Sequence, residues 1–180
     1  QTAQKLRGLV NYLRVDTNCI QLTEKRAEKL IQASRSGVPV LLVCSVDALS
    51  GSVYEQVKGY PMREIVYRNI RKIIRLRRQS RAQLNLQLQF VVQKENAHEA
   101  GEFLSYWNSL LECQGGAWHD EILFKPLSVD GGAQGQAQSD ILYGETLRRQ
   151  RIHATEGAVS TRVWSSRPWQ VDDQHKQKRS

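Results

Sequence analysis

The sequence predicts an α/β fold in which parallel strands alternate with helices, as in part of a (β/α) barrel. Apolar runs of strand length, rich in β-branched residues, cover 38–46 and 84–92. Helical patterns cover 23–33 and 63–79, so strand and helix alternate along the first two thirds of the chain. Runs that are apolar on both faces are typical of a covered parallel sheet. Short connections between the elements imply right-handed crossovers, which fit either a partial barrel or a small open sheet.

The first two predicted strands flank one helix. Residues 9–15 are expected to form the first strand, which is followed by a polar turn. Thr23 can cap the next helix, which runs to about Ala33 and ends before Gly37. The second strand is expected over 38–46.

Two helices are predicted between the second and third strands. Ser52 and Glu55 fit a capping box that begins a short helix, which Gly59 ends. A long amphipathic helix follows over 63–79, and the third strand covers 84–92. The pattern therefore continues the alternation.

The last predicted helix and strand complete the ordered part of the chain. Asn96 and Glu99 fit a second capping box, which begins a helix over 97–111. A fourth strand is expected over 121–124, and it ends at Lys125. Four strands leave sheet edges that something must cover, such as a missing barrel half or a partner chain.

The composition of the chain changes at residue 128. Residues 128–139 are rich in Gly and Gln, as linkers are. Residues 148–180 show no sustained period of 2 or 3.6. We therefore expect a partial barrel over 1–127, truncated on its N-terminal side. Residues 128–180 are expected to form a Gly/Gln-rich linker and an irregular, largely disordered polar tail.

The composition is that of a globular domain with an excess of positive charge. The chain has 180 residues, 40% of them hydrophobic, and a formal net charge of +8. Much of the excess lies in the helix over 63–81. Its amphipathic pattern fits a solvated basic face better than a phosphate-binding surface. No apolar run approaches the roughly 20 residues that cross a bilayer, and the start lacks a signal-peptide pattern, so a cytoplasmic location is expected.

The three cysteines form no local metal or redox motif. Cys19, Cys44 and Cys113 are far apart, without C-x-x-C or other ligand spacing. Cys44 lies in an apolar run and is expected in the core. No metal ligand and no catalytic residue is assigned from the sequence.

Polar side chains follow each predicted strand, where ligands of α/β proteins bind. Seven of these residues are candidates for a common pocket: Asn18 after the first strand, Ser45 and Asp47 after the second, Gln89, Lys94 and Asn96 at the third, and Lys125 after the fourth. For each residue the alternative is a purely structural role in a turn, at a strand end or at a helix cap. Their placement at successive strand ends favours a shared ligand site.

Five segments, in order and spacing, resemble segments of the radical S-adenosylmethionine (SAM) enzymes. The likeness extends over about residues 5–132 and is carried by Val15 to Thr23, Cys44 to Ser50 with Val53 to Gly59, Arg68 to Ile70, Gln89 to Glu99, and Phe124 to Leu127. The chain most resembles the branch that carries an extra C-terminal cluster-binding (SPASM) domain and acts in peptide or cofactor maturation.

The resemblance implies a partial (β/α) barrel with its site at the C-terminal strand ends. Ser45 and Asp47 match positions that contact the ribose or methionine part of SAM. Asn18 and Gln89 match positions that line the pocket. The implied cofactors are SAM and a 4Fe-4S cluster, and the implied substrate is a peptide or cofactor precursor.

The chain departs from the family at the cluster. The family's C-x-x-x-C-x-x-C loop, its Gly-Gly-Glu-type motif and its auxiliary cysteines do not occur in this sequence. Without the cluster no electron reaches SAM, because the cofactor carries that chemistry. We therefore expect a fragment or degenerate copy of a radical SAM enzyme that is inactive alone. The alternative is a non-catalytic binding protein that uses the basic helix over 63–81 for nucleic acid or an acidic partner.

Overall fold

The chain forms one parallel sheet with helices between its strands. The computed structural model describes residues 9–111, 119–128, 132–155 and 159–163. The strands are β1 (Leu13–Thr17), β2 (Val40–Ser45), β3 (Leu84–Val92), β4 (Asp120–Pro126) and β5 (Val159–Val163). The helices are α2 (Glu24–Arg35), α3 (Gly51–Lys58), α4 (Arg63–Ser80), the short 3-10 helix η1 (Ala97–Glu99), α5 (Ala100–Asn108) and α6 (Gly132–Arg149).

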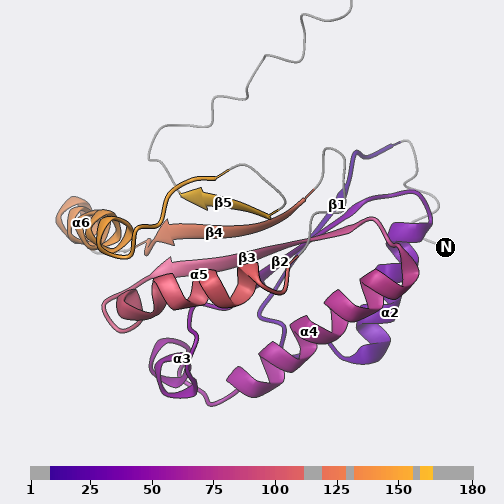
Figure 1. Cartoon of the computed structure of the whole chain (residues 1–180), viewed down its shortest axis with the longest axis horizontal. Coiled ribbons are helices and arrows are strands. Elements are labelled where there is room, and N and C mark those ends of the chain that lie inside the picture. The colour runs from indigo at the N-terminus through magenta and orange to yellow at the C-terminus, as the bar shows by residue number, and fades with distance from the viewer. Residues whose placement is uncertain (1–8, 112–118, 129–131, 156–158, 164–180) are drawn as a thin grey trace, which may run out of the picture.

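The topology is that of a partial β/α barrel. All neighbouring strands are parallel, and their spatial order, β1-β2-β3-β4-β5, is their order in the sequence. A doubly wound sheet reverses its strand order and carries helices on both faces. Here the order never reverses, and α2, α4 and α5 lie together on one side of the sheet (Figure 1). The predicted fold class is therefore confirmed.

The two faces of the sheet differ in chemistry because side chains alternate along each strand. The outer face, under the helices, carries buried apolar residues such as Leu42, Leu86 and Phe124. The strand register places another set on the opposite, inner face: Arg14, Asp16, Leu41, Val43, Ser45, Asn85, Gln87, Gln89, Val91, Glu121, Leu123, Lys125, Ser160 and Arg162. Most of this set is polar, as suits the interior of an incomplete barrel.

The core lies between the outer face and the helices. Ile70 and Ile73 of α4 are fully buried, and the aromatic rings of Phe90, Phe103 and Trp107 pack against one another. The hydrophobic stripe on α4 leaves Arg68, Arg71, Arg75 and Arg78 exposed, whereas Arg63 is partly buried and Arg77 is fully buried.

One buried ion pair crosses the core at the start of β4. Arg77 Nη1 and Nη2 donate to Asp120 Oδ1 and Oδ2 at 2.5 and 2.7 Å, and both side chains are fully buried. Asp120 Oδ1 also accepts from the Leu86 backbone N–H at 2.9 Å. The pair therefore ties α4 to β3 and β4.

The predicted elements are largely confirmed, with shifts at their ends. The third strand has its predicted bounds, and the basic helix ends one residue later than expected. The first strand is displaced to 13–17, because its side chains alternate between exposed and half-buried only there. The fourth strand extends over 120–126.

The expectation of a linker and irregular tail from residue 128 is wrong over two segments. α6 covers 132–149, and Tyr143 on its buried side donates to the Phe124 carbonyl at 3.0 Å. β5 adds a fifth strand beside β4. Both elements depend on tertiary contacts with β4, which a periodicity search over Gly- and Gln-rich sequence cannot detect. Trp164, Trp169 and the rest of 164–180 lie outside the described residues.

Both predicted capping boxes are also wrong. Ser50, not Ser52, caps α3 by accepting from the Val53 N–H at 3.3 Å. Asn96 makes no cap hydrogen bond, and Glu99 binds another segment. Among the described helices, none is both long and apolar enough to span a bilayer.

Candidate ligand site at the strand ends

The end of β2 carries an ion pair built around Asp47. Its Oδ2 accepts from Ser45 Oγ at 2.7 Å and pairs with Lys58 Nζ, which also donates to Ser45 Oγ at 2.9 Å. Its Oδ1 accepts from the Val91 N–H at 2.7 Å. The Asp47 side chain is only 3% exposed, so its carboxylate is committed to partners within the chain. Its left-handed φ of 63° turns the chain sharply out of β2.

Asn96 locks the ends of β2 and β3 together. Its Nδ2 donates to the carbonyls of Asp47 and Val91 at 2.7 and 2.8 Å, and its Oδ1 accepts from the Gln93 N–H at 2.7 Å. The residue is fully buried. Three hydrogen bonds satisfy most of the amide's capacity, so Asn96 shapes the wall of the site rather than its surface.

Glu99 anchors the loop that follows Asp47. Its carboxylate accepts from the Leu49 N–H at 2.7 Å and from the Ser50 N–H at 3.1 Å. The next residue along that loop, Gly51, begins α3, and Lys58 ends that helix beside Gly59, whose φ is +81°. The loop, the helix and the Lys58–Asp47 pair are therefore held as one unit.

The middle of the inner face carries a row of hydrogen-bonded polar side chains. Gln89 Nε2 donates to Gln87 Oε1 at 3.0 Å, and Gln87 Nε2 donates to Glu121 Oε1. Glu121 Oε2 forms an ion pair with Arg162, whose Nε lies 2.9 Å away. Ser45 is the register partner of Gln89, so the structure brings Ser45, Asp47 and Gln89 together as the sequence predicted.

Asn18 lies apart from this group, in the turn after β1. It is exposed, and its Oδ1 accepts from the Ile20 N–H at 3.2 Å. This hydrogen bond forms an Asx turn, which is an ordinary structural role for an Asn after a strand. Next to it, on β1, Arg14 Nε and Nη2 clamp the carboxylate of Asp16 at 2.9 Å each.

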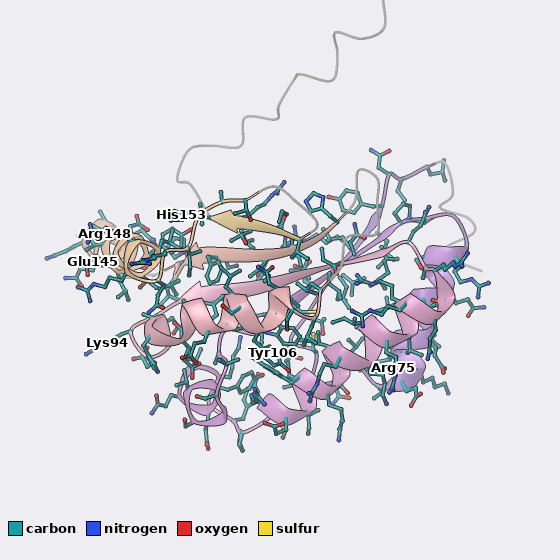
Figure 2. All side chains as sticks on the ribbon, in the orientation of Figure 1. Arg75, Lys94, Tyr106, Glu145, Arg148 and His153 are labelled. Carbon is teal, nitrogen blue, oxygen red and sulfur yellow. The ribbon has the colours of Figure 1, made fainter. Side chains whose placement is uncertain are left out.

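The positive charge of Lys125 on β4 affects Asp16 on β1. The hydrogen bond from Arg14 is the main cause that lowers the pKa of Asp16, and the positive charge of Lys125 lowers it further. β1 and β4 are three strands apart, about 14 Å in a flat sheet. The charge of Lys125 therefore acts on Asp16 over a long range across the inner face. Lys94, in contrast, is exposed beyond the end of β3 (Figure 2).

The described cysteines do not fit an iron–sulfur cluster. Cys19 and Cys44 are both fully buried on the helix side of the sheet, as predicted for Cys44. Hydrogen bonding with the Cys19 thiol and complete burial raise the pKa of Cys44, which disfavours the thiolate that binds iron. Cys113 lies outside the described residues, and within them no three His, Cys, Asp or Glu side chains gather as a metal site would require.

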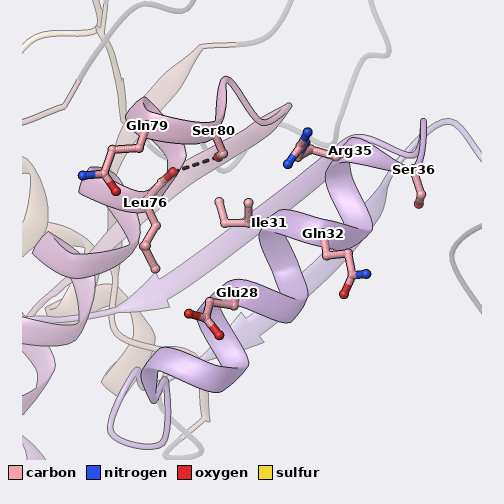
Figure 3. Close-up of a pocket in the computed structure, with 8 residues that line it drawn as sticks. All are labelled: Glu28, Ile31, Gln32, Arg35, Ser36, Leu76, Gln79 and Ser80. Carbon is pink, nitrogen blue, oxygen red and sulfur yellow. Dashed lines mark hydrogen bonds between the residues drawn. The ribbon is translucent and has the colours of Figure 1, made fainter.

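A groove on the opposite side of the molecule does not belong to this site. It has a volume of about 770 Å³ and lies between α2 and the end of α4, where Glu28, Gln32, Arg35 and Gln79 are among its lining residues (Figure 3). α2 and α4 end there because β2 and β3 begin just afterwards. The groove is therefore at the sheet end opposite to Asp47 and Asn96.

Four residues of the site were missed as functional candidates from the sequence. The sequence places Lys58 in one of the radical SAM-like segments and Glu99 in a capping box, without a role in the site. A Lys before Gly at the end of a helix is a local pattern that could have marked Lys58 as a candidate. Glu121 was read as a strand residue, and Arg162 lies in the segment expected to be irregular. The pair of Glu121 with Arg162 depends on β5 joining the sheet, which no local pattern indicates.

The chain is similar in structure to a domain of a known protein. No family model and no curated protein matches the chain. A crystal structure of a domain of pyruvate-formate lyase-activating enzyme from Bacteroides vulgatus ATCC 8482 is 12% identical, with a TM-score of 0.44. The match covers 86% of this chain and 81% of that one.

Proposed function

We propose that the chain is a radical SAM-like partial barrel that binds SAM on its inner face, at the C-terminal strand ends, and does not cleave it alone. The observation that carries the proposal is the polar inner face, where Ser45 and Gln89 are register partners. Parallel sheets are normally covered by apolar packing on both faces. A polar face with organised donors and acceptors suits a polar ligand. The ordered series of radical SAM-like segments supports SAM as that ligand.

The candidate residues divide into two groups by their burial. Gln89 is half-buried, and no described residue donates to its amide oxygen, so it is placed to contact the ligand, with Asn18, Lys94 and Lys125 at the rim. Asp47 and Asn96 are buried and fully engaged, so they hold the pocket wall. Ser45 joins the two groups because its hydroxyl already bonds Asp47 and Lys58.

Catalysis needs parts that the described residues do not supply. In the radical SAM enzymes a 4Fe-4S cluster provides the electron that cleaves SAM, and a peptide or cofactor precursor loses the hydrogen atom. The buried positions of Cys19 and Cys44 leave them unsuited to bind such a cluster. A complementary barrel half or partner chain would have to provide it.

Calorimetric titration with SAM tests the proposal. We expect saturable binding to the wild-type chain and an affinity at least about tenfold lower for Gln89→Leu, since one or two hydrogen bonds are worth about 1–2 kcal/mol. Gln79→Leu, in the groove on the helical side, is the matched control and should bind as the wild type does. Equal binding by both variants, or no binding by the wild type, would refute the site.

Anaerobic reconstitution tests the claim of inactivity. We expect the reconstituted chain to hold no four-iron cluster by iron and sulfide analysis, and incubation with SAM and a reductant to leave SAM intact. A SAM-reducible cluster on this chain alone would refute the claim.

A second candidate function concerns the outward face of α4. Arg68, Arg71 and Arg75 recur at helical spacing there, all exposed, and within the described residues no acidic side chain pairs with them (Figure 2 labels Arg75). Such a stripe fits the phosphates of a nucleic acid.

Salt-dependent binding of a random DNA duplex tests the second function. Changing the three arginines to alanine should weaken binding. It should also reduce the slope of log affinity against log salt concentration by the amount expected for about three phosphate contacts. A control with Lys25, Lys29 and Arg35 of α2 changed to alanine removes equal charge from another helix. Equal loss in both variants would show that net charge alone attracts the duplex and would refute a site on α4.

A further inference from the structure

Arg162 is held by a buried carboxylate in a way that leaves most of its guanidinium unused. Its Nε lies 2.9 Å from Glu121 Oε2 in an ion pair, and its two Nη nitrogens make no contact of this kind with a described residue. The Arg162 side chain is 56% exposed, whereas Glu121 is only 10% exposed. The Nε of Arg162 is therefore held at the barrel wall, and its two Nη nitrogens lie at the open inner face.

Glu121 is itself positioned by its neighbours. Gln87 donates to its other carboxylate oxygen, and Gln89 donates to Gln87. A carboxylate fixed in this way sets the direction of the guanidinium. A preorganised arginine loses less side-chain entropy when it binds a ligand.

Arg14 on β1 shows what a fully neutralised arginine looks like on the same face. Both its Nε and its Nη2 bind Asp16, so the carboxylate occupies one complete side of the guanidinium. Its exposed fraction of 51% is similar to that of Arg162. Arg14 and Arg162 are therefore exposed to a similar degree. They differ in how many guanidinium nitrogens lack a partner among the described residues.

Lys125 adds a second positive charge near the free end of Arg162. Arg162 is the register partner of Leu123, and Lys125 lies two residues further along β4, on the same face. No carboxylate among the described residues forms an ion pair with Lys125. Glu121 balances one of these two positive charges, so Arg162, Glu121 and Lys125 together keep an excess of positive charge that favours a ligand anion.

We propose that Arg162 and Lys125 form an anion subsite on the inner face, which takes a carboxylate or phosphate group of a ligand. The free Nη pair matches the two oxygens of either group, and Lys125 supplies a point charge. The inference rests on the proposed function only in placing a ligand on the inner face. It requires neither SAM nor a cluster.

Nuclear magnetic resonance titration of the full chain tests the subsite. Inorganic phosphate and succinate are the probes, with sodium chloride at equal ionic strength as reference. We expect saturable shifts of the Arg162 Nε–Hε signal and of the amides around Lys125 with at least one probe, and the probe that binds identifies the anion class. Arg162→Gln should weaken this binding at least about tenfold. Arg162→Lys, which keeps the charge and loses the planar pair of donors, should weaken it severalfold.

Arg14→Gln is the matched control, and it should bind the probe as the wild type does. Shifts that are linear and equal to those with chloride would overturn the subsite. An equal loss in the Arg14 and Arg162 variants would also overturn it, because general charge would then explain the binding. If SAM binding persists while probe binding fails, only the subsite falls. If the probe binds and SAM does not, the proposed function falls.

Discussion

The Asn96 side-chain amide donates to the Asp47 carbonyl at 2.7 Å and so joins the chain leaving β2 to the chain leaving β3. The same nitrogen reaches the Val91 carbonyl at 2.8 Å, and the side-chain oxygen accepts from the Gln93 N–H. One buried residue thus satisfies three backbone groups at the strand ends. The geometry of the candidate site depends on it.

Replacing Asn96 by alanine should therefore destabilise the fold by about 3 kcal/mol, because three buried backbone groups lose their partner. Urea unfolding followed by circular dichroism measures the change. Asn108→Ala is the control: Asn108 is exposed at the end of α5 and should change the free energy of unfolding by less than about 0.5 kcal/mol. Similar losses in both variants would contradict the role given to Asn96.

The buried Arg77–Asp120 pair should be costly to break from one side. Asp120→Ala leaves a buried guanidinium without its carboxylate, and we expect a loss of about 3–5 kcal/mol. Asp16→Ala breaks the exposed pair with Arg14 and should cost less than about 1 kcal/mol. Thermal unfolding of the two variants side by side gives the comparison, and equal costs would show that the Arg77 pair is not desolvated.

The pKa of Asp16 should respond to changes at both Arg14 and Lys125. Because Arg14 is its main partner, Arg14→Gln should raise the Asp16 pKa toward the ordinary value for aspartate. Lys125→Gln should raise it by a smaller amount, since only a charge interaction across the inner face is lost. Carboxyl carbon shifts, followed by nuclear magnetic resonance against pH, measure both. No effect of the Lys125 change would place Lys125 away from β1.

The lowered Asp16 pKa also fixes the sign of its pH dependence. A carboxylate whose pKa is lower in the folded state contributes stability that is present above its unfolded pKa, near 3.9. That contribution is lost as the pH falls through the folded pKa. Asp16→Asn should therefore remove a small part of the acid sensitivity, visible only below about pH 4.

Cys44 should be unreactive in the folded chain. Its pKa is raised by the hydrogen bond with Cys19 and by burial, and its sulfur has no access to solvent. Alkylation by iodoacetamide at pH 8, followed by peptide mass spectrometry, should label Cys44 only at the rate at which the protein opens. Rapid labelling under native conditions would contradict its place in the core.

Much of the barrel could be predicted because its outer face has a strong pattern. The run over 84–92 is apolar enough to mark β3 to the residue, and the hydrophobic stripe of α4 identifies that helix despite its many arginines. α6 and β5 could not be predicted, since their Gly, Gln, Ser and Thr residues acquire a structure only by packing on β4.

The candidate site was predicted in position more than in detail. Parallel strands bring their C-terminal ends to one edge, so the proximity of Ser45, Asp47 and Gln89 follows from alternation alone. Loop geometry determines which polar side chains face inward and which form hydrogen bonds with the backbone. The left-handed turn at Asp47 and the buried amide of Asn96 have no signature in the sequence.

The most direct measurement of the central claim is a map of amide shifts on titrating the cluster-free chain with SAM. We expect saturable changes at Ser45, Gln89 and Lys125, on the inner face, and none at Gln32 or Gln79 in the groove on the helical side. Changes confined to that groove, or no saturable change anywhere, would contradict it.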